Sequence, residues 1–310
     1  MPKTHVVTGG AGFIGSHLCD YLIKRGDRVI CVDNLVGTKG SSRNVDHLIG
    51  TERFRFVEED ILEWATPGRL DGVDTVFHQA ASKMTVSLED PERDLTVNAL
   101  GTLRLLMSAG ESGVRKFVLG STGSVYGGLE AVQDERHPTR PLSVYGVSKL
   151  AGEQYARVVG ALYNLDTTVL RYFHVIGSRQ DDSPTGGVVP IFLRNCDEKI
   201  NLTIFGSGEQ VRSFTSVADV VAANVLVSEN PAASNRVFNC ASGIRVTIQE
   251  LADYIISTSK APVTADYGQE RPGDIFNFNV VNTELVSLGM KFDTNWRAIV
   301  DKVRESRSGF

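Results

Sequence analysis

The sequence predicts an α/β protein with a Rossmann-type, doubly wound parallel sheet and a smaller C-terminal α/β substrate domain. Three observations lead to this fold class. Short β-branched runs alternate with longer amphipathic stretches in the first half, and a glycine-rich turn follows the first apolar run. After about residue 174 this regularity loosens, which indicates that a second, smaller unit begins there.

The expected strands of the first half are short apolar runs that each stop where Gly, Asp, Ala or Ser begins a loop. They are His5–Thr8, Arg28–Val32, Arg53–Val57, Thr75–His78, Lys116–Leu119 and Thr168–Phe173. Amphipathic spacing predicts helices between them, at Phe13–Arg25, Leu95–Ser112 and Val144–Leu162.

In the second half, residues 178–187 have the composition of a loop, and Leu202–Phe205 that of a short strand. A helix is expected at Val217–Ser228, followed by a buried strand at Arg236–Cys240 that can rejoin the first sheet. The Thr247 to Glu250 spacing is typical of a capping box, which would open a helix that runs through Ile256.

Composition excludes several classes of protein. The formal charge of −5 and the absence of a Lys/Arg block argue against a nucleic-acid partner. The sequence contains neither a run of ~18 apolar residues nor a signal-peptide pattern, so we expect no membrane partner and a cytoplasmic location. The four cysteines are widely spaced and the histidines form no cluster, so neither disulfides nor a metal site are expected.

Glycines occupy positions 9, 12 and 15 between an expected strand and an expected helix. This order directs the amide groups of a helix N-terminus, here including Phe13 and Ile14, at a pyrophosphate. The spacing alone also fits a purely structural tight turn. The functional interpretation is strengthened by Asp33, which ends the next strand 18 residues after Gly15.

A carboxylate at Asp33 accepts hydrogen bonds from adenosine ribose hydroxyls and repels a 2′-phosphate. Asn34 and Leu35 follow it, with no Arg directly after the strand, so NAD is favoured over NADP. Lys39 and Arg43 lie close enough in sequence to keep NADP open. Residues 1–173, with 213–243 rejoining them, are therefore expected to form an NAD-binding domain, and residues 174–212 and 244–310 the substrate domain.

Tyr145 and Lys149 are four residues apart in an expected helix, so both side chains can reach one ligand. A phenol with a pKa near ~10 is a poor base at neutral pH, and a nearby ammonium group favours the phenolate. Taken alone, this pair could equally be a Tyr and a Lys that pack side by side on an exposed helix without any catalytic role.

The chain resembles the extended short-chain dehydrogenase/reductase family, in particular its nucleotide-sugar epimerases of the UDP-galactose 4-epimerase type. The similarity covers nearly the whole chain. It rests on residues 8–15 (TGGAGFIG), 33–35 (DNL), 60–61 (DI), 78–81 (HQAA), Asn98, 101–102 (GT), 121–127 (STGSVYG), 145–149 (YGVSK) and 171–174 (RYFH).

This resemblance implies that Tyr145 removes a sugar hydroxyl proton, that Thr122 hydrogen-bonds this hydroxyl, and that Lys149 binds the nicotinamide ribose and lowers the tyrosine pKa. It implies adenine contacts from Asp60 and Ile61 and a cofactor or substrate contact from Lys83. The remaining cofactor contacts implied by the family motifs are Ala80, Ala81, Asn98 and Phe173.

Related dehydratases and decarboxylases carry an acidic residue two positions before the Tyr126-Gly127 pair, where this chain has Ser124 preceded by Gly123. The resemblance therefore implies an epimerase that inverts C4 of a UDP-hexose through a 4-keto intermediate, with UDP-glucose and UDP-galactose favoured. Alternatives are epimerases or oxidoreductases acting on UDP-N-acetylhexosamine, UDP-glucuronate or dTDP- and CDP-sugars, and a non-catalytic NAD-binding sensor.

The resemblance also implies substrate contacts and a homodimer. Arg212 and Arg271 would clamp the diphosphate, Asp274 would be a further substrate contact, and segments that contain Val188, Val189, Thr203 and Phe205 would enclose a uracil base. Phe278 stands where a bulky side chain in relatives excludes N-acetylated sugars. His174 replaces the usual Asn, which leaves the sugar open, and the helices at Leu95–Ser112 and Val144–Leu162 resemble those that pair across a homodimer.

Overall fold

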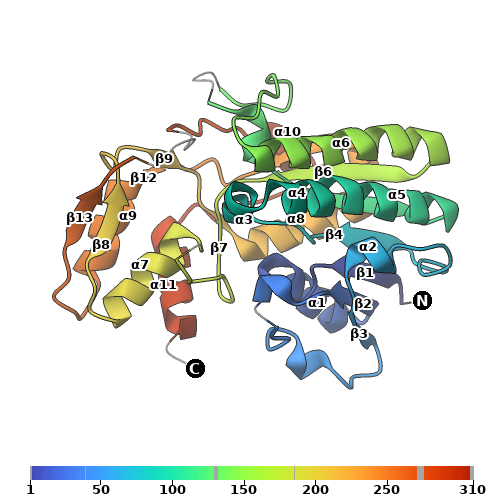
Figure 1. Ribbon diagram of the computed structural model, residues 1–310, viewed down its shortest axis with the longest axis horizontal. Coiled ribbons are helices and arrows are strands. Elements are labelled where there is room, and N and C mark those ends of the chain that lie inside the picture. Colours follow the sequence, from blue (N-terminus) through green and yellow to red (C-terminus); the bar gives the residue numbers. More distant parts are fainter. Residues whose placement is uncertain (1, 39, 129–131, 185, 271–275, 308–310) are drawn as a thin grey trace.

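The computed structural model describes residues 2–38, 40–128, 132–184, 186–270 and 276–307. At its centre is a seven-stranded sheet with the strand order β11-β6-β5-β4-β1-β2-β3 (Figure 1). Every neighbouring pair in this sheet is parallel. This is the order of a Rossmann-type doubly wound sheet with one added edge strand, so the predicted fold class is confirmed.

The sheet and its flanking helices come mainly from the first half of the chain. The strands are β1 (Thr4–Thr8), β2 (Arg28–Asp33), β3 (Phe54–Glu58), β4 (Thr75–His78), β5 (Lys116–Thr122), β6 (Asp166–Tyr172) and β11 (Arg236–Cys240). The helices are α1 (Phe13–Arg25), α2 (Ile61–Trp64), α3 (Met84–Glu89), α4 (Pro91–Leu95), α5 (Thr102–Glu111), α6 (Val144–Tyr163) and α8 (Val217–Glu229). Each predicted strand of the sheet is present.

The predicted helix Leu95–Ser112 is wrong in its first part. Residues Thr96–Gly101 form a π-helical segment, and the regular helix α5 begins only at Thr102. A π-turn is wider than an α-turn, and such turns often occur at functional sites. Here the Thr102 hydroxyl donates to the Asn98 carbonyl at 2.7 Å within this segment. Hydrophobic periodicity does not distinguish this turn from an ordinary helix.

Successive residues of each strand face opposite sides of the sheet, and both sides are buried. Val7 and Phe77 belong to the core on one side, against α1 and α8, whereas Val6 and Val76 belong to the core on the other, against α5 and α6. Burial on both faces explains why the strands read as nearly continuous apolar runs.

The C-terminal part has its own hydrophobic core and lies to the left in Figure 1. Its helices are α7 (Val188–Asp197), α9 (Ile248–Ser257) and α11 (Trp296–Arg307). Its strands form three pairs, which are β8 (Leu202–Phe205) with β13 (Ala265–Gly268), β9 (Val211–Arg212) with β12 (Val246–Thr247), and β7 (Val175–Ile176) with β10 (Thr215–Ser216). The short helix α10 (Thr283–Ser287) packs against β11. No helix in the described ranges is long and apolar enough to cross a membrane.

Two expectations for the second half are confirmed. β11 lies beside β6 and so rejoins the first sheet, and the capping box at Thr247 and Glu250 opens α9. The division of the chain into domains at residue 173 stays a prediction.

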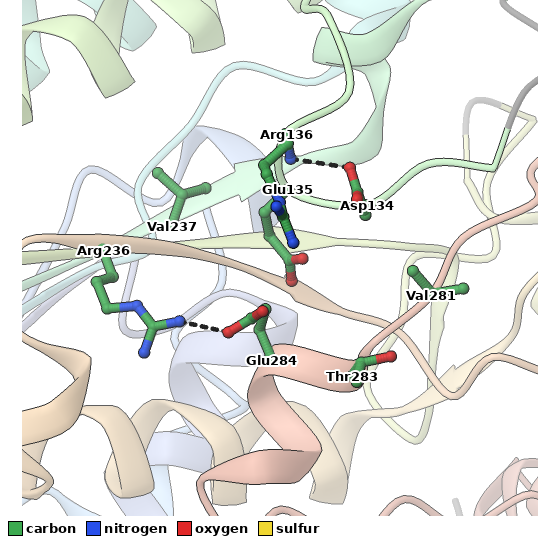
Figure 2. Close-up of a pocket in the computed structure, with 8 residues that line it drawn as sticks. All are labelled: Asp134, Glu135, Arg136, Arg236, Val237, Val281, Thr283 and Glu284. Carbon is green, nitrogen blue, oxygen red and sulfur yellow. Dashed lines mark hydrogen bonds and ion pairs between the residues drawn. The ribbon is translucent and has the colours of Figure 1, made fainter.

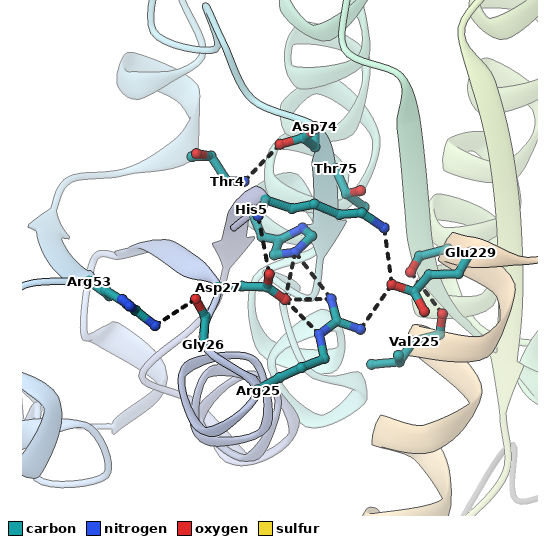
Figure 3. A network of polar contacts seen from close by, with 12 residues as sticks. Thr4, His5, Arg25, Gly26, Asp27, Arg53, Asp74, Thr75, Val225 and Glu229 are labelled. Atoms are coloured by element: carbon teal, nitrogen blue, oxygen red, sulfur yellow. Dashed lines mark hydrogen bonds and ion pairs between the residues drawn. The ribbon is translucent and has the colours of Figure 1, made fainter. Parts of the chain in front are cut away.

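A polar network joins elements at the amino edge of the sheet (Figure 3). Arg25, at the end of α1, donates to Asp27 at 2.6 Å and to Glu229 of α8 at 2.9 Å. The buried His5 ring lies 3.4 Å from the same Asp27 carboxylate. These contacts tie α1 to α8 at the edge opposite the carboxyl ends of the strands.

His78 joins three elements at the carboxyl edge. Its Nδ1 lies 2.7 Å from the Thr8 hydroxyl and its Nε2 lies 2.9 Å from the Thr102 hydroxyl. Because the Thr102 hydroxyl donates its hydrogen to Asn98, it can only accept from Nε2–H, and Nδ1 must then accept from Thr8. Burial lowers the pKa of His78 to about 3, and the Lys149 ammonium acts in the same direction.

We predict that His78 makes the fold sensitive to acid. The folded pKa is below the ordinary value of 6.5, so the unfolded chain binds more protons between the two values and stability falls as the pH falls. Between pH 6.5 and 5 this group should cost roughly 1.5 kcal/mol of unfolding free energy. Urea unfolding at several pH values should show a shallower pH dependence for His78→Gln than for the unchanged chain.

The matched control is His47→Gln, because the His47 ring is exposed and lies 2.6 Å from Asp20 on the surface. This variant should keep the pH dependence of the unchanged chain. An identical acid sensitivity in His78→Gln would remove His78 as the cause.

Candidate active site

The glycine turn joins β1 to α1 and leaves no room for side chains. Gly9 has a φ of +63°, and a Cβ built on it would lie 2.6 Å from the Ala80 amide nitrogen. A Cβ on Gly15 would overlap the Gly9 carbonyl oxygen. Gly12 stands at the N-cap of α1 and has no side chain with which to cover the first amides of the helix. The turn therefore presents bare backbone, as a pyrophosphate site requires.

Asp33 ends β2 beside this turn and is 8% exposed. Its carboxylate accepts from the Ala11 amide at 3.0 Å and from the Leu35 amide at 2.8 Å. Burial raises the pKa of Asp33, and these backbone bonds act against the shift. A carboxylate has about four acceptor positions, so Asp33 can brace the turn and still accept from a ribose hydroxyl.

Asn34 and Asp60 are joined side chain to side chain at 2.7 Å. Asp60 also caps α2 by accepting from the Leu62 amide at 2.9 Å, and this cap fixes Ile61 as the first residue of that helix. The ends of β2 and β3 are thus held together at the position where the family resemblance implies adenine contacts.

A cavity of about 680 Å³ extends along the carboxyl edge from the glycine turn. Most of the cofactor contacts that were predicted from the sequence line it, namely Gly9, Gly12, Phe13, Ile14, Gly15, Asp33, Asn34, Asp60, Ile61, Ala80, Ala81 and Lys83. The bare glycine backbone, the acid at the end of β2 and the length of the cavity together fit an NAD molecule. Asn98 and Phe173 are buried beside the site and lie outside this lining set, as do Tyr145 and Lys149.

The sequence reasoning missed the segment 178–183, which we call the strap. It contributes Arg179, Gln180 and Asp181 to the cavity wall. His17 of α1 donates to the Ser178 carbonyl at 3.0 Å, and Arg179 pairs with Asp20 of α1 at 2.8 Å. No periodic pattern or glycine motif marks such a loop, so only the distant ion pairs reveal it.

Lys83 lies across the cavity from the strap. Its ammonium pairs with Asp181 at 2.7 Å, and the carboxylate also accepts from the Ser183 hydroxyl at 3.0 Å. The lysine that was expected to approach cofactor or substrate therefore also fastens the strap. Arg43 and Asn44, which were not predicted as cavity residues, line the wall near Asp33.

Thr122, Tyr145 and Lys149 meet where β5 ends and α6 begins. Ser143 caps α6 by accepting from the Gly146 amide at 3.1 Å, which places Tyr145 in the first turn. The Thr122 hydroxyl acts to lower the pKa of the Tyr145 phenol, so the two groups lie close together. The Lys149 ammonium donates to the Gly120 carbonyl of β5 at 2.7 Å. The three side chains that were predicted as catalytic are therefore brought together.

The protein groups around Tyr145 and Lys149 shift the pKa of both side chains. Burial raises the pKa of Tyr145 to about 12, the Thr122 hydroxyl opposes the shift, and the Asp94 carboxylate adds to it. Burial also lowers the pKa of Lys149 to about 8. The protein groups alone therefore do not lower the tyrosine pKa, because the lysine is directed at a backbone carbonyl and desolvation dominates.

α6 is held against the sheet by a buried ion pair. Arg171 of β6 donates to both carboxylate oxygens of Glu153, with a shortest distance of 2.6 Å, and to the Tyr126 hydroxyl at 2.7 Å. The Ser121 hydroxyl donates to the same carboxylate. A buried pair needs such additional partners to offset its desolvation. The result is a fixed orientation of the helix that carries Tyr145 and Lys149.

Three of the expected substrate residues form a second group. The His174 ring contacts the Phe278 ring edge-on at 4.7 Å, and the Arg212 guanidinium lies 5.6 Å from the centre of the same phenylalanine ring. Burial lowers the pKa of His174 well below its usual range, and the Arg212 charge adds to this, so the imidazole is neutral. His174 has a φ of +38°, a conformation that Asn adopts more readily than most residues.

The other expected substrate residues are placed less closely together. Val188 and Val189 open α7, where Val189 is completely buried in the C-terminal core. Thr203 is exposed and Phe205 half-buried on β8. Arg271 and Asp274 lie outside the described residues.

A second cavity, of about 500 Å³, lies beside the outer edge of β11 (Figure 2). Its wall includes Arg236, which pairs with Glu284 at 2.5 Å, and Glu135, which accepts from the Asn239 amide at 2.8 Å. None of the predicted site residues lines it. Arg236 and Glu284 are engaged with each other, and Asp134 and Glu135 with backbone amides, so we assign it no ligand.

The sequence and the structure of this chain are similar to those of known proteins. Residues 5–241 match the model of the NAD dependent epimerase/dehydratase family. The chain is 36% identical over 283 residues to the UDP-glucose 4-epimerase of Mycolicibacterium smegmatis, with 90% of each chain covered. The crystal structure of UDP-glucose 4-epimerase with UDP-glucose from Thermotoga maritima superposes with a TM-score of 0.92, 34% identity and 99% of each chain covered.

A third relative acts on a different sugar. The UDP-glucuronic acid 4-epimerase of Bacillus cereus, in complex with UDP-glucuronic acid and NAD, gives a TM-score of 0.92 at 28% identity. The alignment covers 99% of this chain and all of that one. The family match and these relatives confirm the resemblance found in the sequence: the chain belongs to the NAD dependent epimerase/dehydratase family and is an NAD-dependent enzyme.

Proposed function

We propose that this enzyme inverts C4 of a UDP-hexose through a transient 4-keto sugar, with UDP-glucose and UDP-galactose as the favoured pair. The observation that carries the proposal is the group of Thr122, Tyr145 and Lys149, which come from the end of β5 and the start of α6 at the same carboxyl edge of the sheet along which the NAD-type cavity lies. Ser124 lies beside Thr122 at 3.2 Å where an acid would assist elimination. A site with a base but without that acid favours epimerisation over dehydration.

The residues of the chain divide the chemistry among them. Thr122 orients the 4-hydroxyl, and Tyr145 takes its proton and later returns one to the C4 oxygen, after the keto sugar has turned and hydride can reach the opposite face of C4. When bound, NAD supplies the hydride acceptor and donor that this proton transfer requires. Lys149 brings positive charge to the base from α6. The glycine turn, Asp33 and the Asp60 region would hold the cofactor.

Positive charge must act on Tyr145 for it to serve as a base, because burial holds its pKa at about 12. A cationic ring close to the phenol favours the phenolate. Deprotonation of Tyr145 would then depend on the bound, oxidised cofactor. Such coupling would keep the base protonated in the protein until the site is complete.

The group formed by His174, Arg212 and Phe278 supports a UDP-hexose without an N-acetyl group. Arg212 suits a diphosphate because its planar fork makes paired charge-assisted bonds to phosphate oxygens. Phe278 is packed between His174 and Phe173, at 4.7 and 5.9 Å, so it cannot easily move aside for a larger substituent. Arg271 remains a proposed diphosphate contact and Asp274 a proposed substrate contact from the sequence.

Two alternatives to this function are an epimerase or oxidoreductase that acts on another nucleotide sugar, and a protein that binds NAD without catalysis. UDP-glucuronate is the substrate named for one structural relative, and UDP-N-acetylhexosamines and dTDP- or CDP-sugars are further alternatives. A non-catalytic NAD sensor is a different class of protein. The close contact of Tyr145 with Thr122 argues against the sensor, because a sensor has no need for a positioned base.

A substrate panel tests this proposal. The purified enzyme is incubated without added cofactor with UDP-glucose, UDP-galactose, their N-acetyl analogues and UDP-glucuronate, and the products are separated by chromatography. Interconversion of UDP-glucose and UDP-galactose is expected to be fastest. Turnover of another pair alone would reassign the sugar, and no change at C4 in any substrate would overturn the epimerase.

We predict that Tyr145→Phe lowers kcat by roughly 10²- to 10⁴-fold, because the proton acceptor is removed. The NAD content, measured after denaturation of the protein, should stay unchanged. Tyr21→Phe is the control, since Tyr21 is exposed on α1, away from the site, and it should keep full activity. Near-normal turnover in Tyr145→Phe would exclude this phenol from the mechanism.

We also propose that the enzyme is a homodimer that pairs through α5 and α6. Val147, Tyr155, Val158 and Leu162 are exposed on α6 and fall within an arc of about 80° around the helix. Leu100 of the neighbouring π-helical segment is also exposed. A contiguous apolar face of this kind favours an isologous contact with a second copy.

We predict that Val158→Glu gives a monomer in analytical ultracentrifugation, whereas the unchanged chain sediments with twice the mass of one chain. A charge at the centre of an apolar contact is left without a partner. Ile200→Glu, at an exposed apolar residue of the C-terminal part, is the control and should stay dimeric. A monomeric unchanged chain would overturn the proposed dimer.

A further inference from the structure

Asp94 of α4 is a carboxylate buried directly behind the catalytic pair. It has no exposed surface, and it forms no ion pair at contact distance within the described residues. Its Oδ1 accepts from the Asn98 amide at 2.9 Å, and its Oδ2 has no hydrogen-bond partner in the described part of the chain. An incompletely satisfied buried carboxylate is costly, so its presence calls for a functional reason.

A short chain of polar groups leads from Asp94 to the catalytic helix. The Asn98 amide that bonds Asp94 also lies 3.1 Å from the Ser148 hydroxyl. Ser148 in turn donates to the Tyr145 carbonyl at 3.0 Å and precedes Lys149 in the chain. The π-turn at Thr96–Gly101 includes Asn98, and α4 packs against α6. Asp94 is therefore connected to both members of the catalytic pair through neutral groups.

The charges around Lys149 leave Asp94 as its uncommitted counter-charge. Glu153, one turn further along α6, is neutralised by Arg171 at 2.6 Å. On the sheet side, Lys149 meets the neutral Gly120 carbonyl, and the His78 of β4 is neutral because its pKa is about 3. Tyr145 faces the Thr122 hydroxyl of β5. The Glu153 carboxylate still raises the pKa of Lys149 more than Asp94 does, but of these two carboxylates only Asp94 has no ion-pair partner within the described residues.

We propose that Asp94 is a positioning residue whose buried carboxylate balances the Lys149 ammonium and sets the pH at which Tyr145 exchanges its proton. The proposal rests on the proposed roles of these two residues. Asp94 acts on them through the electric field and through Asn98 and Ser148, without touching the substrate.

The directions of the pKa shifts agree with this role. The Asp94 carboxylate raises the pKa of both Tyr145 and Lys149. For Tyr145 it adds to the larger effect of burial, and for Lys149 it opposes that effect. Burial raises the pKa of Asp94 itself, and the Ser148 hydroxyl, the Lys149 ammonium and the Asn98 amide oppose this shift. Loss of the Asp94 charge should thus lower the pKa of both catalytic groups together.

The first test is the pH profile of kcat for Asp94→Asn with UDP-galactose. Asparagine has the same shape and can still accept from Asn98, so the charge alone is removed. Both limbs of the profile should move to lower pH by about one unit. Asp90→Asn is the matched control, because Asp90 is exposed four residues earlier and asparagine also caps helices well. Its profile should be unchanged.

A loss of activity that is equal at every pH in Asp94→Asn would overturn the proposal, because it would indicate a structural role. Failure of this variant to fold would overturn it as well, for the same reason.

The second test needs no substrate and is therefore independent of the proposed function. Urea unfolding is measured for Lys149→Met, Asp94→Asn and the double variant. Lys149→Met leaves the buried carboxylate without its counter-charge, so adding Asp94→Asn should recover stability. Strictly additive effects of the two substitutions would show that the charges are not coupled and would overturn the proposal.

Discussion

The whole site depends on how closely the backbone approaches itself at the glycine turn. A Cβ on Gly15 would overlap the Gly9 carbonyl, and one on Gly9 would lie 2.6 Å from the amide after β4. Because no side chain intervenes, α1 can start directly above the ends of β1 and β4. Asp33 then ties the end of β2 to the same turn through the Ala11 amide. Three strand ends converge at one place, and the cavity follows their edge.

The catalytic side uses a different means of fixing geometry. Here the positions come from buried charges, each held by several partners, of which Arg171 with Glu153 is the strongest. This pair fixes the orientation of α6 against β5 and β6. The bond from Lys149 to the Gly120 carbonyl fixes the position of α6 along β5. Backbone contact thus locates the cofactor, whereas side-chain electrostatics locate the base.

Sequence patterns predict those parts that local rules determine. The strands are recognisable because both faces of the sheet are buried, and Asp33 is recognisable because it ends a strand, whereas Asp60 is indicated only by the family resemblance. The strap is not predictable, since it is held by ion pairs from Arg179 to Asp20 and from Asp181 to Lys83, far apart in sequence. The π-turn around Asn98 and the short helix α2 lack a distinctive hydrophobic period. The sequence patterns also did not predict the helices α7 and α11. The raised tyrosine pKa depends on desolvation, which only the packed structure reveals.

The pairing of β11 with β6 has a consequence for the growing chain. Residues 236–240 fill the position beside β6, more than sixty residues after that strand has been synthesised. Until then, the backbone N–H and C=O groups along the outer side of β6 have no strand to bond, and such an edge invites pairing with other chains. A fragment ending at the apparent boundary near residue 173 would carry this open edge permanently. The first half of the molecule is therefore complete as a sheet only when translation has nearly finished, and its protection from aggregation arrives with the second half.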